Sequence, residues 1–163
     1  MSPKQHATAV IRFARKISGD FLKDYPENKF TFQTSPADNH AMWVLGHLAL
    51  TDSWIAGVVG AKGTTSPDGW DNLFGSGSKP VDDPRKYPPV AEVKKVFDAN
   101  RAALLNWFEA AADKDLALQL SEKTGGFMTD PVDGMLKMAW HEGWHMGQVA
   151  TLRKALGLPS VMG

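Results

Sequence analysis

The chain has 163 residues, no cysteine and 18 basic against 18 acidic side chains, which suits one soluble globular domain spanning residues 1–163. Its formal net charge of zero, without a run of lysine or arginine, gives no electrostatic reason to expect nucleic acid or a membrane as a partner. The lack of cysteine excludes disulfides and thiolate ligands, so a metal ion would have to be held by histidine and carboxylate.

The first part of the chain predicts two helices. Apolar residues recur at steps of three and four from Ala7 to Phe21, which is typical of an amphipathic helix that should end near Tyr25. Because this start carries charges throughout, it is unlike a secretory signal, and we expect a cytoplasmic protein. Ser35-Pro36-Ala37-Asp38 then has the residue types of a helix cap and first turn, which predicts a second helix from there to about Gly60.

Residues 41–61 are apolar enough to raise the question of a membrane span. His47, Asp52 and three glycines lie within this segment, and no basic residues flank it. Charged and polar groups are expensive inside a bilayer, so these residues favour a helix buried in protein. We therefore expect no membrane.

Residues 62–89 form a long connection that is rich in Gly, Ser, Pro and Asp. Its one aromatic island, Trp70 to Phe74, should dock onto the surface of the domain. Neighbouring antiparallel helices need only a few connecting residues, so a loop of this length predicts a crossover that spans the bundle. The helices before and after it should then run parallel.

Two more helices follow the crossover. The third should begin after Pro89 and fade around Asp113, with Val93, Phe97, Leu104 and Phe108 on one face and Lys94, Lys95 and Arg101 elsewhere. The fourth should begin at Asp130-Pro131, with the proline in its first turn, and end at Leu156-Gly157, with the glycine after its last turn. Because no segment has a convincing strand pattern, the sequence predicts an all-α four-helix bundle with a long crossover between its second and third helices.

The fourth helix contains HEGWH, residues 141–145, which fits the H-E-x-x-H pattern of zinc metalloproteases. His141 and His145 are four residues apart, so they lie on one helical face and can present two imidazoles to one metal ion. A zinc protease takes a third ligand after the motif, but residues 146–163 contain no His, Asp or Glu. This absence counts against a protease.

A third ligand would then come from an earlier helix. His47 lies near the middle of the second helix, and midpoints of helices meet in a bundle whichever way the helices run. His40 lies in the first turn of that helix, and His6 opens the first helix and should be solvated. A lone buried histidine is usually a hydrogen-bonded core residue, but three imidazoles without a shared partner would leave several donors and acceptors unsatisfied. Together, His47, His141 and His145 favour a metal site.

Other residues near these histidines have two interpretations each. Gln148 shares their helical face and could orient a ligand imidazole or an exchangeable metal-bound water, or it could fill a polar seam position. Glu142 is rotated about a quarter turn away, so it is a general base for a metal-bound water, a partner in a buried ion pair, or a residue that supports a ligand from behind. Trp43 and Trp144, like Trp54 and Trp140, could wall a pocket or belong to the core.

Two segments resemble the DinB/YfiT-like superfamily of metal-binding four-helix bundles. They are NHAMWVLGHLAL in the second helix and HEGWHMGQVATLRKALG in the fourth, and the crossover text LFGSGSKP and YPPVAEV is also similar. The resemblance covers about Asn39 to Gly157. It implies that His47, His141 and His145 are the metal ligands, that the bundle is up-down-down-up, and that the protein is a homodimer. Members of the superfamily include thiol-dependent transferases and isomerases.

These observations lead to a functional expectation and two alternatives. Three neutral imidazoles would hold one divalent ion per chain, Zn²⁺ or Ni²⁺, leaving its double charge to lower the pKa of a bound water or of a low-molecular-weight thiol. We expect a metal-dependent enzyme that acts on a small molecule, either a thiol-dependent transferase or a hydrolase. A non-catalytic metal-binding or stress-response protein is the alternative, and a zinc metalloprotease is a more distant one.

Overall fold

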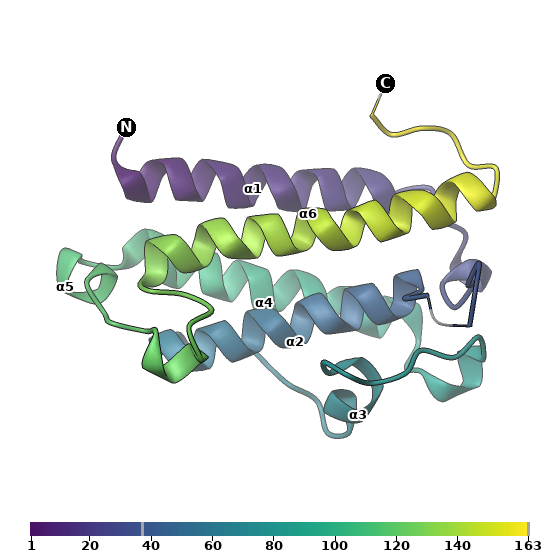
Figure 1. Cartoon of the computed structure of the whole chain (residues 1–163), viewed down its shortest axis with the longest axis horizontal. Helices are drawn as coiled ribbons and strands as arrows, with labels where there is room; N and C mark the ends of the chain where they lie inside the picture. The colour runs from purple at the N-terminus through teal and green to yellow at the C-terminus, as the bar shows by residue number, and fades with distance from the viewer. Residues whose placement is uncertain (37, 163) are drawn as a thin grey trace.

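The computed structural model describes residues 1–36 and 38–162, and these residues form helices and loops without a strand. Four helices are long: α1 (Pro3–Leu22), α2 (Ala41–Val59), α4 (Val90–Ala110) and α6 (Pro131–Ala155). Figure 1 shows α1 and α6 side by side and running one way, and α2 and α4 side by side and running the other. The predicted all-α bundle with up-down-down-up topology is confirmed.

The ends of α1 and α6 follow from their local sequences. Ser2 and Gln5 form a capping box at the start of α1, with Pro3 in the first turn. Asp130 caps α6 by accepting hydrogen bonds from the backbone N–H groups of Val132 and Asp133. The predicted start of α6 at Asp130-Pro131 is therefore confirmed, whereas α1 ends at Leu22, slightly before the expected end near Tyr25.

The predicted start of α2 at Ser35-Pro36 is wrong. The helix begins at Ala41, and its N-cap is His40, whose Nδ1 accepts a hydrogen bond from the backbone N–H of Trp43 at 3.0 Å. The Asp38 side chain instead accepts a hydrogen bond from Thr34 Oγ1 in a local turn, and Ala37 lies outside the described residues. An imidazole with a lone pair on Nδ1 caps a helix as an Asn or Asp oxygen does, and nothing in the local pattern distinguishes it.

Residues 62–89 form a crossover between α2 and α4, as predicted, and carry the short helices α3 (Trp70–Phe74) and η2 (Pro84–Lys86). Trp70 and Phe74 are buried, and α3 packs against α2 (Figure 1). Asn100 of α4 holds the start of the crossover by exchanging two hydrogen bonds of 2.8 Å with the backbone of Thr65. The aromatic island is thus a docked element of the domain.

The connection from α4 to α6 contains α5 (Asp113–Leu116) and η3 (Glu122–Thr124). It encloses one end of a core built from α1, α2, α4 and α6. By length and composition α2 could cross a membrane, but 67% of its most apolar window is buried inside the bundle. That burial is typical of a central core helix, as expected for residues 41–61.

Candidate metal centre

Three histidines meet between α2 and α6 and are called here the histidine cluster: His47, His141 and His145. His141 Nε2 lies 3.3 Å from His47 Nε2 and 3.0 Å from His145 Nε2. One ligand atom from each ring lies within 4.8 Å of the other two. The structure therefore brings together the three residues that the sequence indicated as ligands, with their Nε2 atoms converging on one point.

Two of the three rings are oriented by hydrogen bonds from Nδ1. His47 Nδ1 donates to the carbonyl of Phe74 at 2.9 Å, and His145 Nδ1 donates to Gln148 Oε1 at 3.0 Å. Because both acceptors are carbonyl oxygens, both rings carry their proton on Nδ1 and present an Nε2 lone pair to the centre of the cluster. Gln148 thus holds the ring of a histidine in the cluster, which fits the orienting role among those considered for it.

The cluster cannot satisfy itself by hydrogen bonding alone. A proton on His141 Nε2 could bond to one neighbouring lone pair but not to both. His141 Nδ1 is buried, and it has no hydrogen-bond partner among the residues that the structure describes. Lone pairs that converge at 3.0 to 3.3 Å repel one another unless a cation lies between them. One metal ion would satisfy all three nitrogen atoms.

Burial keeps the histidine cluster neutral. Loss of solvation lowers the pKa of His47, and it lowers the pKa of His145 to about 4. The pKa of His141 falls to about 3, first through loss of solvation and then through the neighbouring His145, His47 and Arg101. Neutral imidazole is the protonation state that binds a metal, so no proton has to leave at neutral pH.

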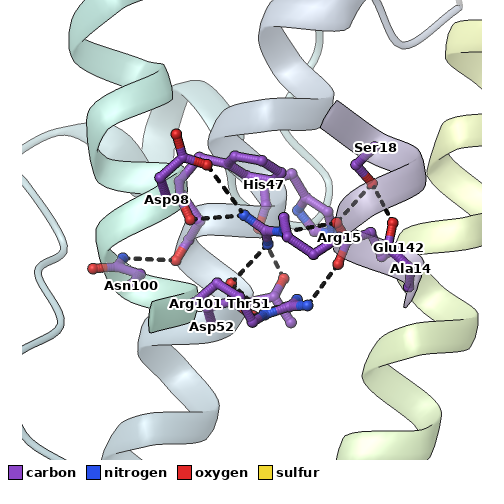
Figure 2. Close-up of polar contacts among 12 residues, drawn as sticks. Ala14, Arg15, Ser18, His47, Thr51, Asp52, Asp98, Asn100, Arg101 and Glu142 are labelled. Atoms are coloured by element: carbon purple, nitrogen blue, oxygen red, sulfur yellow. Dashed lines mark hydrogen bonds and ion pairs between the residues drawn. The ribbon is translucent and has the colours of Figure 1, made fainter. Parts of the chain in front are cut away.

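Glu142 lies in a buried ion pair with Arg101, as Figure 2 shows. Its Oε2 accepts a hydrogen bond from Arg101 Nη1 at 2.6 Å, and its Oε1 accepts one from Ser18 Oγ at 2.7 Å. Arg15 Nε lies 2.8 Å from Oε1 as an ion pair without an aligned hydrogen bond. Burial by itself would raise the pKa of Glu142, but Arg101 and Arg15 outweigh it and the pKa is lowered. With both oxygens engaged, this carboxylate is poorly placed to act as a general base.

The ion pair belongs to a larger group, the charge cluster of Arg15, Asp52, Arg101 and Glu142, which joins α1, α2, α4 and α6 (Figure 2). Arg101 is only 2% exposed and binds Asp52 at 2.8 Å. The prediction from the sequence that Arg101 lies away from the apolar face of its helix is wrong. It follows Phe97 by four residues and precedes Leu104 by three, so spacing alone puts it on that face.

The tryptophans have different surroundings. Trp43 is buried and stacks on His47, with ring centroids 4.5 Å apart and an interplanar angle of 9°. Trp144 is 56% exposed, and its ring centroid lies 4.9 Å from that of His145. Trp140 stacks on Trp144 at the surface, whereas Trp54 contacts Phe127. Trp43 and Trp144 therefore flank the histidine cluster from the inside and the outside of the bundle.

The two remaining histidines lie outside the cluster. His40 is fully buried as the cap of α2, with Nε2 3.2 Å from both the carbonyl of Val81 and the hydroxyl of Tyr87. Loss of solvation lowers its pKa to about 4. His6 is exposed on the first turn of α1, as expected.

The chain is a four-helix bundle with a three-histidine cluster whose geometry suits a single metal ion. A family model described as the DinB superfamily matches residues 11–149, which is most of the chain. The chain therefore belongs to the DinB superfamily, and the resemblance seen in its helices is confirmed. No curated protein and no solved structure gives a significant match to the chain.

Proposed function

We propose that the chain binds one divalent metal ion, Zn²⁺ or Ni²⁺, through the Nε2 atoms of His47, His141 and His145. The observation that carries this proposal is the convergence of three nitrogen atoms, two of them fixed as acceptors by the hydrogen bonds of Nδ1 to Phe74 and Gln148. Imidazole ligands suit zinc and nickel, and a three-histidine set leaves a coordination position open for a reactant.

We further propose that the protein is a metal-dependent enzyme for a small molecule, either a thiol-dependent transferase or a hydrolase. A divalent ion held by three neutral imidazoles supplies an undiminished double positive charge, which favours the ionised form of a thiol or water beside it. The chain contributes orientation and water exclusion. Phe74 and Gln148 hold two of the rings, Trp43 closes the inner side, and the half-exposed Trp144 leaves an apolar wall at the surface.

The proposed enzyme works in the cytoplasm as a homodimer. Support for a second copy comes from large apolar side chains exposed on the neighbouring helices α1 and α6, namely Val10, Phe13, Leu136 and Trp140. Large apolar side chains that are exposed on two packed helices are typical of an interaction surface. Sedimentation of the purified protein measures its oligomeric state, and a monomer at micromolar concentration would remove the homodimer from the proposal.

A second candidate function is metal binding without catalysis, as in a stress-response protein. It is favoured by the position of Glu142, because the only acidic residue of the HEGWH segment has both oxygens engaged in the charge cluster. The same observation weakens the protease alternative, which needs this glutamate as its general base. The transferase and hydrolase reactions need only the metal ion and an open position.

Metal analysis and activity tests decide between these functions. Protein prepared without a nickel column should contain about one Zn²⁺ or Ni²⁺ per chain, since three ligands on two rigid helices form a preorganised site. Turnover of a low-molecular-weight thiol with an electrophile, or of an ester, that is abolished by a chelator supports an enzyme. Metal at full occupancy with no turnover favours the non-catalytic candidate, and degradation of casein would revive the protease.

A further inference from the structure

We infer that the crossover positions the metal ligand of α2, so that docking of residues 70–78 and metal binding at His47 reinforce each other. This inference rests on the proposed metal site. It assigns to α3 and Ser78 a positioning role, because they act through His47 and Trp43 and do not touch the metal themselves.

The first link is the hydrogen bond from His47 Nδ1 to the carbonyl of Phe74 at 2.9 Å. Phe74 is the last residue of α3, and the final carbonyl groups of a helix have no partner within it. His47 satisfies one of these carbonyls, and the carbonyl in turn fixes the tautomer and the rotation of the ring. A second partner of this kind conventionally orients a metal-ligating histidine.

The second link is the packing of Phe74 against Gly46, the residue before His47. A Cβ atom on residue 46 would collide with three carbon atoms of the Phe74 ring, so this close approach requires glycine. Phe74 is fully buried, and its ring also contacts Trp70 and Tyr87. The position of the Phe74 carbonyl therefore depends on the fit of its ring over the backbone of α2.

The third link holds the ring that stacks on His47. Trp43 Nε1 donates a hydrogen bond of 2.7 Å to Ser78 Oγ, which donates one of 3.1 Å to the carbonyl of Leu73. Trp43 lies one turn before His47 on α2, and the planes of the two rings are nearly parallel. The crossover thus restrains His47 along its edge through Phe74 and on its face through Trp43.

The two ligands on α6 have no comparable tie to the crossover. His145 is oriented by Gln148 of its own helix, and His141 Nδ1 has no partner among residues 1–36 and 38–162. Undocking of the crossover would therefore release one ligand in three. Because binding linkage is reciprocal, a metal ion that holds His47 in place should also stabilise the docked crossover.

Gly46→Ala tests the inference, with Gly143→Ala as the matched control. Each substitution adds one methyl group beside a proposed ligand within a long helix, but a Cβ at residue 143 has open space around it. Affinity for Co²⁺ and Zn²⁺ is measured by competition with a chromophoric chelator, together with the Co²⁺ absorption spectrum. We expect Gly46→Ala to bind about 10- to 100-fold more weakly, with an altered Co²⁺ spectrum, and Gly143→Ala to match the wild type.

Trypsin provides a second readout, because the crossover carries Lys62, Arg85 and Lys86, none of which is followed by proline. Metal should slow cleavage within residues 62–89 of the wild-type protein, and Gly46→Ala should lose most of this protection. If Gly46→Ala does not fold, Ser78→Ala takes its place, since it removes the two hydrogen bonds that Ser78 Oγ makes with Trp43 and with the carbonyl of Leu73 and adds no atom near Phe74.

The outcomes separate this inference from the proposed function. A wild-type protein that binds no metal refutes the metal site itself. The role of the crossover is refuted, and the metal site is not, by a different result. In that result the wild-type protein binds metal, and a folded Gly46→Ala or Ser78→Ala variant has unchanged metal affinity, Co²⁺ spectrum and protection from trypsin.

Discussion

Removing the negative charge of Glu142 should destabilise the bundle far more than it disturbs the metal. The charge cluster holds two arginines against two carboxylates, so it is electrically neutral. Glu142→Gln leaves one positive charge in excess at a site where Glu142 and Asp52 are completely buried and Arg101 nearly so. Breaking a buried ion pair by removing one partner costs about 3–5 kcal/mol, because the remaining charge is desolvated without compensation.

For a domain of this size, each kcal/mol lowers the melting temperature by about 2–4 °C, so the expected drop exceeds about 6 °C. Thermal and urea unfolding measure it, with Glu109→Gln as the matched control. Glu109 also pairs with an arginine, Arg12, but that pair is exposed at the surface and contributes at most about 1 kcal/mol. Metal content should persist in Glu142→Gln, since Glu142 is not a ligand. A loss of stability no larger than that of Glu109→Gln would refute the importance of the charge cluster, and loss of activity with metal retained would restore Glu142 as a base.

Three further predictions concern the histidines and the crossover. His47→Ala should lose most of its bound metal, whereas His40→Ala should keep it; the reverse result in metal analysis would show that the third ligand was chosen wrongly. Because burial lowers the pKa of His40 to about 4, against an ordinary value of about 6.5, the unfolded chain binds its proton first as the pH falls. The contribution of neutral His40 to stability is therefore complete above pH 6.5 and is lost toward pH 4, by on the order of 3 kcal/mol. Urea unfolding of the metal-free protein should show that the free energy of unfolding falls less steeply with decreasing pH in His40→Asn than in the wild type. Deleting residues 70–74 removes the buried Trp70 and Phe74 and should lower the free energy of unfolding by at least about 3 kcal/mol and weaken metal binding; wild-type melting and metal content would show that α3 supports neither.

Local sequence determined most of the bundle, because helix periods and caps act over a few residues. The start of α6 follows from Asp130 and Pro131, and the spacing of His141 and His145 places two imidazoles on one face before any tertiary contact is known. His47 was selected as the third member of the cluster by its midpoint position in a helix expected to begin at Ser35. The choice holds although its premise does not, because α2 begins at Ala41 and His47 lies in its second turn. Excess loop length similarly predicted the crossover and hence the parallel direction of α2 and α4.

Tertiary structure decided what surrounds those histidines, because the partners come from segments far apart in the chain. The carbonyl that orients His47 belongs to Phe74, 27 residues later, and the groups that engage Glu142 come from α1 and α4. His40 became a helix cap because Val81 and Tyr87 fold over it, which no local pattern signals. A helix period shows which residues share a face, but only the packing of four helices determines whether a charge on that face meets its partner in the core.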